Sequence, residues 1–171
     1  MKLSEELKDA LNAQIGHELG ASHQYLAIAA HFDAAGLAGL ARFFYRQSDE
    51  ERDHAMKFLH FVVDSDGARA IPEGPAPRPR FGTAAEAVGA ALEWEQEVTR
   101  QIYALVAIAR EDGNLIAQRF LDWFVDEQFE EVTTMSELLQ VVERAGEDRL
   151  FVVEEYLERE GKLPPPSPPE E

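Results

Sequence analysis

The 171-residue sequence contains no cysteine, which excludes disulfide bonds, zinc–thiolate sites and iron–sulfur clusters. Basic residues are scarce, since 16 Lys and Arg stand against 33 Asp and Glu, for a formal net charge of −17. Such a surface repels nucleic acid and anionic membranes and attracts cations. No apolar run approaches the roughly 18 residues of a membrane span, and no signal-peptide pattern opens the chain. We therefore expect a cytoplasmic protein that binds neither nucleic acid nor membrane.

The alternating pattern of β-strands is also missing, and apolar residues recur instead at helical spacing. Ser4 is a predicted N-cap, and Thr83 with Glu86 forms a capping box. Gly36 and Gly39 break the chain after the first helix, and an Asp-Gly-Asn turn follows the third. The sequence therefore predicts helices over approximately residues 4–32, 40–66, 84–111, 115–144 and 147–160.

The long proline-rich segment over residues 67–82 determines the predicted topology. Its four prolines exclude a helix interior. Fully extended, the segment spans up to about 53 Å, whereas a helix of 28 residues is roughly 42 Å long. It can therefore run the length of a bundle and leave the second and third helices parallel. We predict an all-α fold: a four-helix bundle with one long crossover loop between helices 2 and 3 and a short C-terminal fifth helix.

Polar side chains interrupt the apolar face of each long helix near its middle. In the second helix, Glu51 and His54 continue the face that runs from Phe44 to Phe58. Residues three apart are neighbours on a helix, so this carboxylate and imidazole converge. The other helices interrupt their core faces at a similar depth, at Glu18, Glu95, Gln128 and Glu131.

These interruptions have an electrostatic consequence. Four carboxylates would lie in a low-dielectric core with no Lys or Arg on the same faces, and each unpaired buried charge costs several kcal/mol or forces protonation. One or two bound dications would neutralise them. Oxygen-rich ligands with one imidazole suit iron or manganese better than structural zinc. The sequence therefore predicts a carboxylate-rich metal site at the centre of the bundle.

Three segments resemble a prokaryotic non-haem ferritin: Gln14–Leu19, Phe43–Met56 and Glu127–Gln128. The resemblance extends to about residue 160. It implies a ferritin-like di-iron domain over residues 1–162, followed by a Pro-rich acidic tail over 163–171 that we expect to be disordered. It also implies iron storage, with Fe(II) oxidised by O₂ or H₂O₂ at a ferroxidase centre and kept as Fe(III) mineral. The container would be a homo-oligomeric shell of about 24 subunits.

The same resemblance implies roles for individual residues. The first iron would be held by Glu18, Glu51 and His54, and Glu51 would bridge to a second iron. Glu95 would hold the second iron, with Gln128 and Glu131 nearby and Tyr25 beside the site. A third iron position, present in bacterial members, would fall on Glu50, Glu127, Glu130 and Glu131.

Several alternatives remain at this stage. Haem is not expected, because Arg52 stands where bacterioferritins carry methionine after the ligand glutamate, and Glu131 replaces their histidine. A di-iron oxygenase would generally have a second Glu-x-x-His motif, which is missing from the fourth helix of this sequence. A rubrerythrin-like peroxidase would carry a cysteine-based iron site, and the sequence has no cysteine. A DNA-coating mini-ferritin would need basic termini. A metal-free interaction module would leave the buried carboxylates unexplained. A solvated acidic face is a second interpretation of four further carboxylates: Glu50, Asp53, Glu127 and Glu130.

Overall fold

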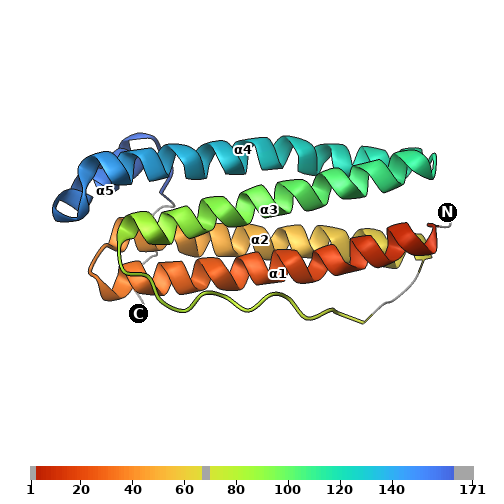
Figure 1. Cartoon of the computed structure of the whole chain (residues 1–171), viewed down its shortest axis with the longest axis horizontal. Coiled ribbons are helices and arrows are strands. Elements are labelled where there is room, and N and C mark those ends of the chain that lie inside the picture. Colours follow the sequence, from red (N-terminus) through yellow and green to blue (C-terminus); the bar gives the residue numbers. More distant parts are fainter. Residues whose placement is uncertain (1–2, 67–69, 164–171) are drawn as a thin grey trace, which may run out of the picture.

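The computed structural model describes residues 3–66 and 70–163, and Figure 1 shows its long helices lying side by side. Every regular element within these ranges is helical. The elements are α1 (Glu5–Ala34), α2 (Ala38–Asp66), α3 (Ala84–Glu111), α4 (Leu115–Ala145), the 3-10 helix η1 (Glu147–Arg149) and α5 (Leu150–Arg159). The predicted all-α class is confirmed, and the predicted fifth helix consists of a 3-10 turn followed by a short α-helix.

Side-chain caps begin three of the helices. The hydroxyl of Ser4 accepts a hydrogen bond from the N–H of Leu7, and Thr83 does the same for Glu86. The side chain of Asn114 caps α4 in the same way. Each cap satisfies a donor that has no partner within its own helix. These local signals explain why the helix starts could be predicted from sequence.

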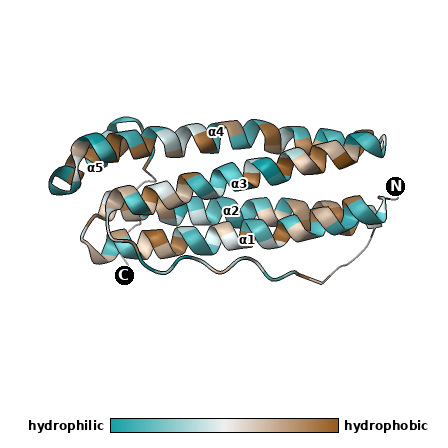
Figure 2. Cartoon of the chain, viewed as in Figure 1, coloured by the Kyte–Doolittle hydropathy of each residue, from teal (hydrophilic) through white to brown (hydrophobic). Residues whose placement is uncertain are grey.

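The core consists of two apolar clusters, one toward each end of the bundle. The first cluster includes Phe44 from the N-terminal half of α2 and Val88 from the N-terminal half of α3. The second includes Phe58 and Ile102 from their C-terminal halves. The two helices therefore run parallel, as the crossover length predicted. Figure 2 shows hydrophilic residues near the middle of α3 between more hydrophobic stretches.

Helices α2 and α4 meet through stacked aromatic rings. The rings of Phe58 and Phe124 lie 4.1 Å apart between centroids, and those of Phe61 and Phe120 lie 4.0 Å apart. Large side chains thus fill the space between these two helices in the second cluster. Toward the middle of the bundle the same space is occupied by polar side chains.

The crossover follows the outer side of α1 along most of its length (Figure 1). Two glycines of α1 allow this close approach. A Cβ atom at Gly16 would lie 2.6 Å from the carbonyl oxygen of Glu73, and one at Gly20 would lie 2.8 Å from Cδ of Pro75. Larger residues would therefore push the crossover off the helix.

The C-terminal elements η1 and α5 form hydrogen bonds with the N-termini of α3 and α2 at one end of the bundle. The carboxylate of Glu147 accepts hydrogen bonds from the N–H of Ala84, at 3.0 and 3.1 Å. Glu154 of α5 accepts from the N–H groups of Gly39 and Leu40. Acidic side chains from η1 and α5 therefore stabilise the N-termini of α3 and α2, where the helix dipole favours negative charge.

Two further sequence expectations concern the ends and the surface of the chain. Of the predicted tail, only Leu163 lies within the described residues, and it packs against the first cluster. Residues 164–171 lie outside them. Among the helices described, none combines the length and the apolar content needed to cross a membrane.

Candidate metal centre

Six polar side chains form a layer between the two apolar clusters. Each is at most 6% exposed, although all are titratable or amide groups. The layer receives side chains from all four long helices, and every member was singled out in the sequence: Glu18, Glu51, His54, Glu95, Gln128 and Glu131.

One half of the layer brings an imidazole and two carboxylates together. Glu18, Glu51 and His54 each offer a ligand atom, and these atoms lie within 4.8 Å of one another. His54 Nδ1 is 3.4 Å from Oε2 of Glu51. Among the described residues, Oε2 of Glu18 and Oε1 of Glu51 have no hydrogen-bond partner although both are buried. Unpartnered buried oxygens beside an imidazole form a set that a divalent cation would satisfy.

The other half is built around Glu95 of α3. The hydroxyl of Tyr25 donates a hydrogen bond to Oε1 of Glu95, and Nε2 of Gln128 donates to Oε2 at 2.8 Å. Oε1 of Gln128 has no partner in the described part of the chain. The Nε2 of Gln47 contacts both carboxylate oxygens of Glu131, at 3.3 and 3.1 Å. This half offers carboxylate and amide oxygens and lacks an imidazole of its own.

Burial shifts the acidity of these groups toward their neutral forms. Burial raises the pKa of Glu18 and of Glu95 to about 7. Burial, together with the negative charges of Glu95 and other carboxylates, raises the pKa of Glu131 to about 9 and that of Glu51 well above its usual value. Burial lowers the pKa of His54 to about 4, so its imidazole is neutral at pH 7 and available as a ligand.

A small pocket lies beside this centre between α2 and α4, and we call it the acidic pocket. Its volume is about 170 Å³. Glu131 belongs both to the pocket wall and to the buried layer, so the two are contiguous. The pocket is lined by Arg46, Gln47, Glu50, Glu127, Glu130, Glu131, Thr134 and Lys162.

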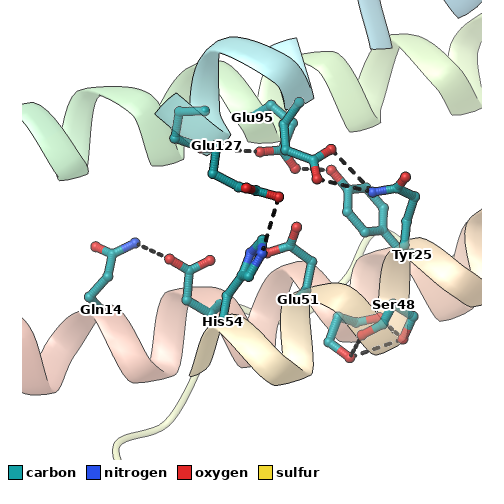
Figure 3. Close-up of polar contacts among 12 residues, drawn as sticks. Gln14, Tyr25, Ser48, Glu51, His54, Glu95 and Glu127 are labelled. Carbon is teal, nitrogen blue, oxygen red and sulfur yellow. Dashed lines mark hydrogen bonds and ion pairs between the residues drawn. The ribbon is translucent and has the colours of Figure 1, made fainter. Parts of the chain in front are cut away.

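Glu127 links the acidic pocket to the centre. Its Oε1 lies 3.7 Å from Nε2 of His54, and Figure 3 shows it reaching from α4 toward that imidazole. Glu127 and Glu50 are half-buried, whereas Glu130 is exposed. Burial is the largest factor that raises the pKa of Glu127, followed by the charges of Glu130 and Glu50. The structure therefore gathers the residues of the third predicted position around one pocket.

Sequence reasoning gave no role to two of the amides that hold carboxylates in place, those of Gln14 and Gln47. Gln14 donates to Oε1 of Glu18 at 3.0 Å (Figure 3). Its side-chain amide also donates to Oε1 of Gln101 on α3 at 3.2 Å. Gln14 lies four residues before Glu18, one helical turn away, and this spacing is the signal from which its role could have been found. Gln47 donates to a carboxylate of α4, a partner that the spacing within α2 does not indicate.

A four-helix bundle with carboxylates and an imidazole at mid-height has the architecture of the helical bundles that bind metals through carboxylates in their core. The ferritin family model, described as a ferritin-like domain, matches residues 8–145. The chain belongs to the ferritin family.

Curated relatives and solved structures agree with this assignment. Ferritin BfrB of Mycobacterium tuberculosis is 40% identical over 155 residues, covering 91% of this chain and 85% of that protein. A bacterial non-heme ferritin of Staphylococcus haemolyticus is 38% identical over 157 residues, covering 91% and 95%. The crystal structure of an open pore ferritin from Archaeoglobus fulgidus matches with a TM-score of 0.87 at 31% identity. That alignment covers 95% of this chain and 99% of the other.

Proposed function

We propose that this protein is an iron-storage ferritin with ferroxidase activity. Fe(II) is oxidised by O₂ or H₂O₂ at a paired site in the buried layer, and the Fe(III) product is stored as mineral inside a closed shell. The observation that carries the proposal is the buried layer itself, where four carboxylates converge without a lysine or arginine among the layer's members. Iron as substrate supplies the missing positive charge.

Each residue of the layer has a role in this proposal. Glu18, Glu51 and the neutral His54 hold the first iron, and Glu51 bridges to the second. Glu95 holds the second iron, with Gln128 and Glu131 beside it. Tyr25 orients Glu95 through the hydrogen bond from its hydroxyl. Anionic oxygens stabilise Fe(III) more than Fe(II), which favours loss of an electron from the bound metal.

The acidic pocket is the proposed third iron position and the route of departure. Glu50, Glu127, Glu130 and Glu131 line it, and Glu131 contributes to both pocket and centre. An iron leaving the second position would therefore meet carboxylates without crossing an apolar layer. We further propose a shell of about 24 copies located in the cytoplasm. No haem is expected.

Anaerobic loading followed by exposure to air tests the proposal. Metal-free protein mixed with Fe(II) should bind about two to three irons per chain and then develop near-ultraviolet ferric-oxo absorbance on contact with O₂. Continued addition should deposit many more irons per assembled particle than the sites can hold. Oxidation no faster than in buffer would contradict the ferroxidase activity, and saturation at the sites would contradict storage.

The two halves of the site should also fill unequally. The first position has an imidazole and two carboxylates, whereas the second has Glu95, the shared Glu51 and weaker neighbours. Crystals soaked anaerobically with limiting Fe(II) should therefore show iron beside His54 first, and Glu131→His should strengthen the second position. Equal occupancy at every iron concentration would favour a permanent di-iron cofactor.

A further inference from the structure

The acidic pocket contains two basic residues, and they differ in how they are paired. Four carboxylates line the pocket together with Arg46 and Lys162. Nε of Arg46 lies 3.4 Å from Oε1 of Glu50, so its partner belongs to the pocket wall. The ammonium of Lys162 lies 3.2 Å from Oε2 of Glu137, which does not line the pocket. Lys162 is thus held at the edge of the pocket by a carboxylate outside it.

The position of Lys162 is determined by the end of α5. Gly161 has a φ of 66°, and the N–H of Lys162 donates to the carbonyl oxygen of Leu157 at 2.9 Å. This arrangement is a common way to terminate a helix. On the other side, Leu163 packs against the first core cluster. The lysine side chain is 25% exposed and therefore lies largely against the protein. Folded structure on both sides places the ammonium beside the pocket.

A fixed positive charge has a direct effect on metal binding in so small a pocket. An ammonium and a dication repel each other, and the four carboxylates attract both. With water-like screening, one unit charge about 8 Å from a dication changes its affinity by about fivefold. The salt bridge to Glu137 moderates this effect, because it directs the ammonium toward a carboxylate outside the pocket.

We propose that Lys162 is a tethered counter-ion that sets the affinity of the acidic pocket for divalent cations. The ammonium weakens cation binding in the acidic pocket, so that iron binds there transiently and then dissociates. Glu137 acts through Lys162, as a positioning residue that determines how far the ammonium reaches into the pocket. This inference rests on the proposed function, in which iron passes through the acidic pocket.

The test uses Mn(II), which stays divalent in air and can be located by anomalous diffraction. Crystals of the metal-free full-length protein are soaked at limiting Mn(II), and the occupancy of the pocket is divided by that of the position beside His54. Lys162→Gln should raise this ratio by up to about fivefold. Glu137→Gln should lower it, because the freed ammonium can approach the pocket carboxylates. The double variant should behave like Lys162→Gln.

Two further variants serve as matched controls. Lys162→Arg keeps the charge and should keep the parental ratio. Arg159→Gln removes one charge near the same end of α5, and Arg159 does not line the pocket, so the ratio should not change. If the role of Lys162 were merely structural, Lys162→Gln and Glu137→Gln would change the occupancy ratio in the same direction, because both break the same salt bridge.

The outcomes separate this inference from the proposed function. If Mn(II) binds neither in the acidic pocket nor beside His54, both the inference and the proposed function are overturned. Mn(II) at the position beside His54 with a ratio that does not respond to Lys162→Gln would overturn only the inference. The same holds if the pocket stays empty in parent and variants while the centre fills.

Discussion

Glu51 is the residue on which both proposed iron positions depend, since it lies beside His54 and faces Glu95 across the buried layer. Glu51→Ala should slow ferric formation at least about tenfold, equivalent to roughly 1.4 kcal/mol of barrier. The metal-free protein should be no less stable, because an uncompensated buried carboxyl is removed.

The rate of ferric formation is measured by stopped-flow absorbance after Fe(II)-loaded protein is mixed with aerated buffer. Asp53→Ala provides the matched control, since Asp53 is an exposed carboxylate on the same helix and should keep the parental rate. If Glu51→Ala and Glu18→Ala both oxidise iron at the parental rate, the reaction takes place elsewhere.

The buried carboxyls should also make the stability of the metal-free protein depend on pH. Burial raises the pKa of Glu18 and Glu95 to about 7, and burial with neighbouring carboxylates raises that of Glu131 to about 9. Their stabilising contribution is fully present below their usual pKa of 4.5 and is lost as the pH rises through the folded values. His54 acts in the opposite sense: its contribution is present above 6.5 and is lost as the pH falls through about 4.

The thermal midpoint of chelator-treated protein should therefore fall between about pH 6 and pH 9. Saturating Mn(II) should abolish most of this fall, because a bound cation stabilises the ionised carboxylates. Glu131→Gln should flatten the upper part of the profile. A midpoint that rises over this range in the metal-free protein would contradict the assignment of buried, protonated carboxyls.

At the scale of elements, the close packing of the crossover against α1 depends on two glycines of α1, Gly16 and Gly20. Gly16→Ala should place a methyl group 2.6 Å from the carbonyl oxygen of Glu73, and a backbone atom cannot move aside without shifting the segment. We expect a loss of about 1–3 kcal/mol, the usual cost of overpacking.

Gly89→Ala is the control for this prediction. Gly89 lies within α3, and a Cβ there would meet no atom of the described residues outside its own helix within 4 Å. Alanine should stabilise the helix at this position by about 0.5–1 kcal/mol. Denaturant unfolding measures both variants, and limited proteolysis reports whether the crossover loosens. Equal effects would show that the close approach does not contribute to stability.

At the scale of the whole molecule, the single chain leaves large apolar side chains in contact with solvent. Phe129 is 76% exposed and Leu115 is 72% exposed. Apolar surface of this kind is commonly covered by other subunits. A shell of about 24 chains of 19.2 kDa would have a mass of roughly 460 kDa with closed symmetry.

Light scattering at micromolar concentration and neutral pH measures that mass directly. A monodisperse particle near this value is the expected result. A monomer or simple dimer would remove storage as the function and favour a catalytic di-iron protein instead.

Much of the bundle could be predicted because the relevant information is local. Ser4, Thr83 and Asn114 cap the helices that follow them, and a cap acts within one turn. Glu18 and Glu51 were found because each interrupts the apolar face of its own helix. The parallel arrangement of α2 and α3 followed from the reach of a proline-rich segment.

Only the tertiary structure decided which side chains pair across helices. Gln47 of α2 holds Glu131 of α4, and Lys162 lies beside a pocket built from α2 and α4. Helical periodicity identifies the face of a helix that is buried, but it does not specify the rotation and axial shift of one helix against another. Those depend on how whole side-chain layers pack together. The sequence by itself determined the helices, their order and the carboxylates at the centre, whereas packing determined the partner of each carboxylate.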